Sequence, residues 1–165
     1  MTLLRILAII IAIVTLLMLL PLVMALVMGE SFMIRPFLIP PATGLALAIL
    51  AVLFIPKEKI SLRSRDGFLL VFLTWILSSL LGSIPYYLSP LNLSICDSIF
   101  ESACGFATTG ATTFQDVEAL PRSLLFWRSL SHWTGGIGII LLTVALMPLK
   151  KIVQKYVLHR IILQL

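Results

Sequence analysis

Charged residues are scarce in this sequence, and their scarcity excludes an ordinary soluble fold. Only 12% of the 165 residues are charged, whereas 60% are hydrophobic. A soluble domain carries about a quarter charged residues, and runs of about 20 apolar residues are typical of transmembrane helices. Four apolar runs, at residues 3–28, 37–55, 67–88 and 124–147, predict an all-α membrane protein. The first run is too long for a cleavable signal peptide, so we expect it to be retained as a span.

Acidic residues are fewer than basic ones, 7 against 12, and the net charge is +5. This excess does not indicate a nucleic-acid partner, because nine of the twelve basic residues gather in three segments, and only Arg35, Arg122 and Arg128 lie elsewhere. If the N-terminus is cytoplasmic, the segments facing the cytoplasm hold Arg5, Lys57, Lys59, Arg63, Arg65, Lys150, Lys151, Lys155 and Arg160. This is the asymmetry of the positive-inside rule. We expect a multi-pass plasma-membrane protein, surrounded by lipid, with both termini in the cytoplasm.

Cysteine and histidine are also scarce, with two of each, and show no zinc-site spacing. On one helix, Cys96 and Cys104 would lie about 12 Å apart, beyond the reach of a disulfide. The spans hold no paired aspartates. Ser131 and His132 are adjacent on the chain, and adjacent helical residues do not face each other. We therefore expect no enzyme and no cofactor.

The order of the segments predicts two parts. Residues 1–56 are expected to form an N-terminal two-helix transmembrane hairpin, and residues 57–66 a basic cytoplasmic linker. Residues 67–148 would form a transmembrane helix, a short re-entrant helix, an extended strand and a second transmembrane helix. Residues 149–165 would form a basic amphipathic tail, which either lies on the cytoplasmic membrane surface or begins a further segment.

Three prolines crowd the predicted start of the second hairpin helix, where a missing N–H group is tolerated. They are Pro36, Pro40 and Pro41. At the end of the third span, Tyr86 and Tyr87 are typical of the aromatic belt at a membrane interface.

A polar stretch at residues 101–112, ESACGFATTGAT, interrupts the apolar runs. Before it, Asn92 or Ser94 is suited to cap a helix, and Gly105 is suited to end it in the left-handed conformation. A helix of about a dozen residues would extend about 18 Å, roughly half a bilayer.

The residues after this short helix fit a cation-binding strand. Irregular backbone at membrane depth is allowed where protein or a water-filled cavity satisfies it, and pore carbonyls replace the hydration shell of a cation. Thr108 and Thr109 can present such carbonyls, and Gly110 can adopt backbone angles closed to other residues. A plain extracellular turn is the alternative for the same composition.

The last span raises two further alternatives. Its glycines either pack closely against the short helix or form a hinge or gate; they are Gly135, Gly136 and Gly138. Arg128 either pairs with Glu101, Asp116 or Glu118, or extends its guanidinium to the interface.

Three ordered motifs carry a family resemblance: LRSRDGFLLVFLTWILSSLLGSIPYYL, FESACGFATTGAT and LPRSLLFWRSLSHWTGGIGIILL. The chain resembles, over residues 62–146, the Trk-type potassium uptake proteins of the TrkH/TrkG/KtrB superfamily. The resemblance implies a bacterial inner-membrane protein with four membrane–pore-loop–membrane repeats around one potassium pathway. The residues that match the first filter strand are Thr108, Thr109, Gly110 and Ala111, whose backbone carbonyls would bind potassium.

The resemblance also implies partners. A cytoplasmic nucleotide-binding regulatory ring is one, although the basic segments are equally explained by the positive-inside rule. Three further repeats are expected after Met147 and are absent from the sequence, and a single strand cannot encircle an ion. The chain is therefore expected either to assemble as four copies or to be an N-terminal portion with the first repeat only. A non-transporting fragment or membrane scaffold is the alternative to potassium transport.

Overall fold

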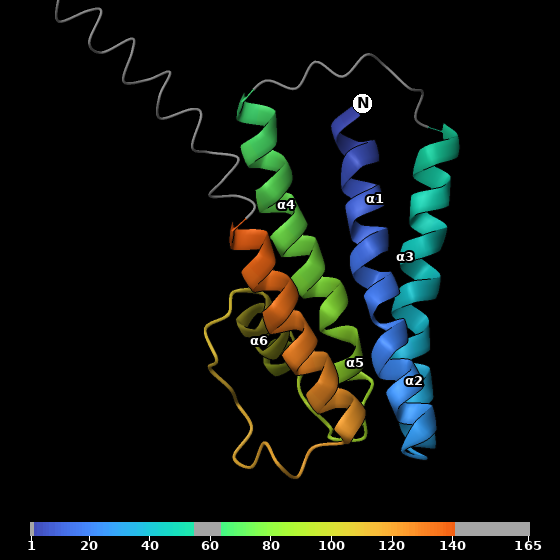
Figure 1. The fold of residues 1–165 in the computed structure, drawn as a ribbon, viewed down its shortest axis with the longest axis vertical. Helices are drawn as coiled ribbons and strands as arrows, with labels where there is room; N and C mark the ends of the chain where they lie inside the picture. Colours follow the sequence, from blue (N-terminus) through green and yellow to red (C-terminus); the bar gives the residue numbers. More distant parts are fainter. Residues whose placement is uncertain (1, 55–63, 141–165) are drawn as a thin grey trace, which may run out of the picture.

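The computed structural model describes residues 2–54 and 64–140. The regular structure of these residues is entirely helical, and three helices are long and apolar enough to cross a membrane. The predicted class, an all-α membrane protein, is confirmed, and a helical hairpin precedes a unit of long helix, short helix, irregular segment and helix (Figure 1). This second unit is called the repeat below. The tail at 149–165 and most of the basic linker lie outside the described residues.

The first span is bent near its middle. It consists of α1 (Thr2–Leu17) and α2 (Leu19–Val27), which meet at Met18. Pro21 follows one turn later, and proline both lacks an N–H donor and crowds the carbonyl four residues before it. The backbone tightens there, since the Met18 N–H donates to the Thr15 carbonyl at 3.1 Å. The break is therefore a proline effect.

The second hairpin helix begins earlier than predicted. A 3₁₀ turn, η1 (Ser31–Met33), leads into α3 (Ile34–Phe54). Only Pro36 therefore lies in the first turn, whereas Pro40 and Pro41 are inside the helix, so the prediction that all three crowd its start was wrong. Thr43 follows one turn later, and its Oγ1 lies 3.1 Å from the carbonyl oxygens of residues 39 and 40.

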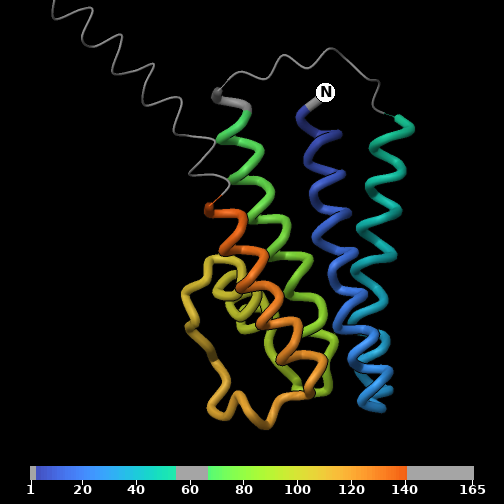
Figure 2. The backbone as a smooth tube through the Cα atoms, in the orientation of Figure 1, coloured from blue at the N-terminus to red at the C-terminus, as the bar shows by residue number. Residues whose placement is uncertain are grey.

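The repeat begins with α4 (Ser64–Gly82) and a short α5 (Ile84–Tyr87), which together supply the third span. Next come α6 (Ile95–Phe106) and, after an irregular segment, a helix over residues 122–140. The predicted fourth span, 124–147, is helical as far as residue 140, and its remainder lies outside the described residues. Figure 2 shows that α6 reaches only about half the height of the bundle and that the chain then returns to the lower end.

The hairpin and the repeat share one buried core at the lower end of the bundle. Its largest fully buried members are Met18, Met33, Phe37, Tyr86 and Trp127. The Trp127 and Phe106 rings pack edge to face, with their centroids 6.0 Å apart. The Trp127 Nε1–H donates to the Gly82 carbonyl at 3.1 Å. Tyr86 is fully buried, so its predicted place in an interface belt was wrong, whereas Tyr87 is 50% exposed.

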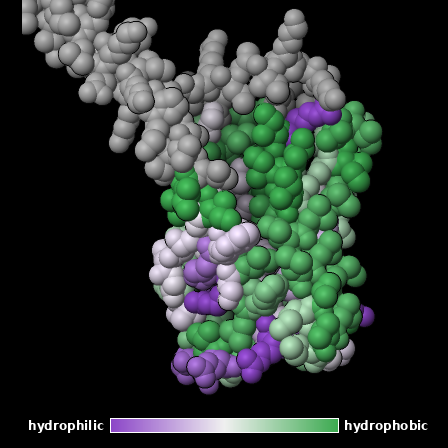
Figure 3. Space-filling model, in the orientation of Figure 1, coloured by the Kyte–Doolittle hydropathy of each residue, from purple (hydrophilic) through white to green (hydrophobic). Residues whose placement is uncertain are grey.

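The outer surface of the hairpin is apolar. Large exposed side chains lie along α1, α2 and α3, and Figure 3 shows a nearly continuous hydrophobic face over these helices. A face of this kind suits lipid. Inside, the helices approach closely through small residues, because a methyl group on Gly44 of α3 would lie 2.2 Å from Thr15 Oγ1 of α1.

Candidate functional site

The short helix α6 starts with a side-chain cap. Ser94 is extended, and its Oγ accepts the Asp97 N–H at 3.1 Å. The same hydroxyl lies 2.7 Å from Asp97 Oδ2, and a carboxylate in the first turn favours the positive helix end. The prediction of a cap at Asn92 or Ser94 is thus confirmed for Ser94. Asn92 instead adopts a left-handed φ of 53° in the preceding turn.

Most residues on the buried face of α6 are small or polar. This face consists of Ser98, Glu101, Ser102, Cys104, Gly105 and Phe106. The apolar residues Ile95 and Phe100 are exposed instead, at 60% and 44%. A helix with this inverted arrangement packs its small residues against neighbouring helices and leaves its apolar residues for lipid or for further protein. Both cysteines are free thiols, Cys96 exposed and Cys104 buried.

The helix ends at Phe106, and the left-handed residue that follows its C-cap is Thr108, not the predicted Gly105. Thr108 has a φ of 56° and donates its N–H to the Gly105 carbonyl at 3.0 Å, while the Thr109 N–H reaches the Cys104 carbonyl at 3.1 Å. These two bonds define a Schellman motif with threonine in the position that glycine normally takes. A β-branched residue in this conformation is strained by about 1–2 kcal/mol.

Gly105 serves helix packing instead of ending α6, which explains why the predicted helix end was wrong. A methyl group on Gly105 would lie 2.3 Å from Ser131 Oγ, so this glycine lets α6 touch the 122–140 helix. From the other side, a methyl group on Gly135 would lie 2.1 Å from the Phe106 carbonyl oxygen. Gly135 therefore serves close packing, one of the two predicted roles. A methyl group on Gly138 would meet no other part of the described chain within 4 Å.

The segment that follows α6, called the strand below, has no regular secondary structure and is exposed from residue 107 to 113. It includes the four predicted ion-binding residues, Thr108 to Ala111. Gly110 has a φ of 75°, a conformation that suits glycine. Its carbonyl lies 3.4 Å from Arg128 Nη2, whereas the Thr108 and Thr109 carbonyls accept no hydrogen bond from the described residues. The structure thus brings the four residues together on one exposed segment.

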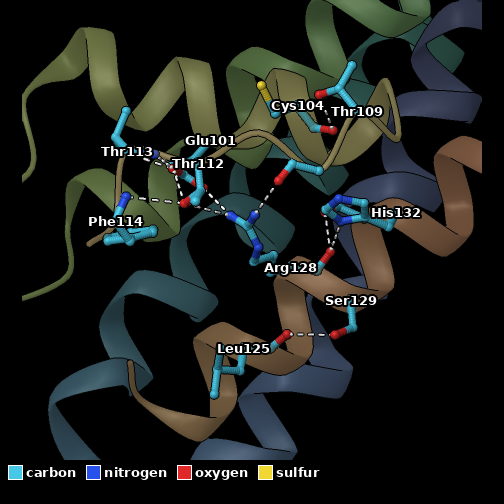
Figure 4. Close-up of polar contacts among 12 residues, drawn as sticks. Glu101, Cys104, Thr109, Thr112, Thr113, Phe114, Leu125, Arg128, Ser129 and His132 are labelled. Carbon is cyan, nitrogen blue, oxygen red and sulfur yellow. Dashed lines mark hydrogen bonds and ion pairs between the residues drawn. The ribbon is translucent and has the colours of Figure 1, made fainter. Parts of the chain in front are cut away.

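A buried carboxylate anchors the far end of this strand. Glu101 is fully buried, and its Oε1 accepts the Thr113 N–H, the Thr113 hydroxyl at 3.0 Å and the Thr112 hydroxyl at 2.8 Å. Its Oε2 accepts a hydrogen bond from Arg128 Nη1 and forms an ion pair with that guanidinium (Figure 4). The α6 helix, the strand and the 122–140 helix therefore meet at one side chain. The anchoring of residues 112 and 113 was not predicted, although a lone acid inside a membrane helix is a signal that it needs partners.

The three predicted partners of Arg128 are now distinguished. Arg128 pairs with Glu101, and its side chain is only 13% exposed. Asp116 instead stabilises the return segment, residues 114–121, which connects the strand to the 122–140 helix. Its Oδ1 accepts the N–H groups of Glu118 and Ala119 at 3.0 and 3.3 Å.

Ser131 and His132 do not form a dyad. Ser131 Oγ and His132 Nδ1 both lie against the Arg128 carbonyl, at 2.7 and 2.8 Å. In the part of the chain that the structure describes, no group of three or more His, Cys, Asp or Glu residues is placed to hold a metal ion. The Thr108 and Thr109 carbonyls are oxygens that receive no hydrogen bond from the described residues.

Comparison with known proteins identifies close relatives. Residues 42–160 match the family model of the TrkH cation transport proteins. The Trk system potassium uptake protein TrkH of Escherichia coli K12 is 47% identical over 107 residues, which cover 63% of this chain and 22% of the relative. TrkG of the same strain is 46% identical over 94 residues, 56% of this chain and 19% of the relative. TrkH of Halomonas elongata is 36% identical over 148 residues, 88% of this chain and 30% of the relative. The chain thus spans less than a third of the length of these relatives.

Proposed function

Since the chain belongs to the TrkH family of cation transport proteins, we propose that it takes part in potassium uptake across a bacterial inner membrane. Its contribution would be one selectivity-filter strand, formed by Thr108, Thr109, Gly110 and Ala111. The relatives are named potassium uptake proteins, and because the chain covers only part of their length, the activity of the whole assembly is part of the proposal.

The observation that carries the proposal is the position of unbonded carbonyls at the end of a half-length helix. The Thr108 and Thr109 carbonyls receive no hydrogen bond from residues 2–54 and 64–140. They follow the C-terminus of α6, the negative end of the helix dipole, about halfway along the bundle (Figure 1). Oxygens in this position can take the place of the water around a dehydrated potassium ion.

The charges around the strand favour passage over trapping. The one fully buried carboxylate nearby, Glu101, is paired with Arg128. The pair carries no net charge, so the ion would meet carbonyl dipoles only and could leave again. The strained φ of Thr108 also supports a functional site, since such backbone strain concentrates where geometry serves a task.

The four residues would not contribute equally. The Gly110 carbonyl is engaged by Arg128 Nη2 at 3.4 Å, which makes it a poorer ion ligand than the two before it. We assign the main contacts to the carbonyls of Thr108 and Thr109. Gly110 would supply the turn, and Ala111 would line the pathway.

One strand needs three more to enclose an ion. They would come from four copies of this chain or from a continuation in a longer protein. Within the chain, the proposed units are the hairpin 1–56, the linker 57–66, the repeat 67–148 and the tail 149–165. The linker and the tail would lie in the cytoplasm with both termini, where a nucleotide-binding regulatory ring is the partner proposed for them.

A charge placed in the strand tests the proposal. In a bacterial strain that lacks potassium uptake, the chain should support growth at low potassium and rubidium uptake. Gly110→Asp should abolish uptake or its preference for potassium over sodium, because a fixed carboxylate binds the ion too tightly. Ala119→Asp, which places the same charge in the exposed return segment, should leave uptake unchanged. Wild-type uptake and selectivity in Gly110→Asp would show that the segment is an ordinary turn.

The second candidate is a non-transporting fragment or a scaffold subunit, and the observation that favours it is that the chain matches only 22% to 30% of the length of the TrkH relatives. It predicts no growth at low potassium while the chain is present in the membrane. Crosslinking in membranes distinguishes the assemblies, because a chain that is only ever monomeric cannot form a four-copy pore.

A further inference from the structure

The helix over residues 122–140 has no cap of its own. The Pro121 carbonyl accepts the N–H groups of Leu124 and Leu125, both at 3.0 Å, which makes Pro121 the N-cap residue. Proline has no side-chain oxygen to receive the N–H groups of the next two residues. Arg122 and Ser123 therefore need an acceptor from elsewhere, because the first amides of a helix have no partner within it.

Glu30 supplies that acceptor from the hairpin, more than ninety residues earlier in the chain. Its Oε1 accepts the Arg122 N–H at 2.7 Å, and its Oε2 accepts the Ser123 N–H at 3.1 Å and the Ser123 hydroxyl at 2.5 Å. With the Leu124 N–H bonded to Pro121, every amide of the first helical turn has a partner. A carboxylate is also the side chain that the positive end of a helix dipole favours.

The turn after α2 places Glu30 there. Gly29 has a φ of 71°, and it donates its N–H to the Leu26 carbonyl at 3.3 Å, while the Glu30 N–H reaches the Ala25 carbonyl at 2.8 Å. This is a second Schellman motif, here with the glycine that the motif prefers. The hydrogen bond from the Glu30 N–H to the Ala25 carbonyl therefore both ends α2 and holds in place the side chain that caps the 122–140 helix.

The capped helix carries the side chain that holds the strand. Arg128 lies six residues after Arg122, about 9 Å along the helix axis. It pairs with Glu101, which in turn accepts the Thr113 N–H at the end of the strand. A movement of the first helical turn would therefore be passed through Arg128 and Glu101 to the strand.

We propose that Glu30 is a positioning residue for the ion pathway: it caps the 122–140 helix from the hairpin and thereby sets the place of Arg128 and of residues 110–113. The hairpin would then act as a support for the strand, in addition to anchoring the chain in lipid. The consequence for selectivity rests on the function proposed above, whereas the cap and its coupling to the strand do not.

Hydrogen–deuterium exchange in the purified full chain tests the cap without any transport assay. Glu30→Gln keeps one acceptor oxygen and removes the charge, so the Arg122 and Ser123 amides should exchange about five-fold faster, as for a lost N-cap. The Thr113 amide should also exchange faster if the cap positions the strand. Glu118→Gln is the matched control, because Glu118 is exposed and its side chain makes no hydrogen bond in the described chain.

A rescue distinguishes capping from a general loss of stability. Pro121→Asp would provide a local cap, and in the Glu30→Gln background it should restore slow exchange at residues 113, 122 and 123. In a chain that transports potassium, the same pair of substitutions should lower and then restore the preference for potassium over sodium.

The outcomes separate the two proposals. Unchanged exchange at Arg122 and Ser123 in Glu30→Gln would overturn the cap, and a change confined to those two amides would overturn the positioning role. If the wild-type chain moves no potassium but the exchange results hold at all three sites, the proposed function fails while the positioning by Glu30 stands.

Discussion

Gly135→Ala should loosen the contact between the 122–140 helix and the end of α6, directly before the strand. The added methyl carbon would lie 2.1 Å from the Phe106 carbonyl oxygen, and it cannot rotate away because the neighbour is backbone. Ordinary carbon–oxygen contact needs about 3.4 Å, so the two helices must separate locally by about 1.3 Å. Overpacking of this kind costs about 1–3 kcal/mol.

Gly138→Ala is the matched control on the same helix. Nothing lies within 4 Å of the methyl group it adds, so only the helix propensity changes. Alanine is better than glycine in a helix by about 1 kcal/mol, which should stabilise this variant. In Gly135→Ala that gain offsets part of the cost, so the two variants should differ by about 1–3 kcal/mol in the stability change.

Reversible unfolding in mixed detergent, followed by circular dichroism and by tryptophan fluorescence, measures both variants. Trp127 is one of the three tryptophans that contribute to this signal, and it reports on the contact because its ring centroid lies 6.0 Å from that of Phe106. Gly135→Ala should unfold at a lower denaturant fraction than the wild type, and Gly138→Ala at the same or a higher fraction. Equal stability of the two alanine variants would refute the reasoning that Gly135 is required by close approach.

Two further predictions concern the strand. Glu101→Gln should destabilise the chain by about 3 kcal/mol, because the Arg128 guanidinium, only 13% exposed, loses its counter-ion. Glu118→Gln, at an exposed position, should change the midpoint of detergent unfolding little. Equal midpoints in both variants would contradict a structural role for the ion pair. Thr108→Gly should stabilise the chain by about 1 kcal/mol, because the φ of 56° at this position suits glycine. Gly110→Ala should destabilise it by a similar amount, because the φ there is 75°. Both are measured by the same unfolding assay, and a destabilised Thr108→Gly would show that contacts of the threonine side chain outweigh the backbone strain.

Much of the fold was predictable because lipid imposes strong rules on a sequence. The apolar runs identified the long apolar helices, and the length between Ser94 and the threonines predicted a short helix of about a dozen residues, as α6 is. The Ser94 cap followed from local chemistry, since a hydroxyl three residues before Asp97 satisfies an amide that the helix cannot. The packing role of Gly135 was one of two predicted alternatives, because small residues are what close helix contacts require.

The errors arose where two local rules compete. Gly105 and Thr108 could each have ended α6, and glycine is the better terminator by itself. The contact with Ser131 leaves no room for a side chain at residue 105, so glycine is used there and threonine takes the left-handed position. Tyr86 likewise suits an interface, but it faces the core that the hairpin and the repeat build together.

The sequence by itself determined that the protein lies in a membrane, the order of its long helices and the segment that carries the exposed carbonyls. These depend on composition and on spacing within one helix, which are local. Only the tertiary structure decided which partner Arg128 takes among three acids, which residue ends α6 and which side chain caps the 122–140 helix. Those choices depend on distances of a few ångströms between residues far apart in the chain, as between Glu30 and Ser123, and such distances exist only after the helices have packed.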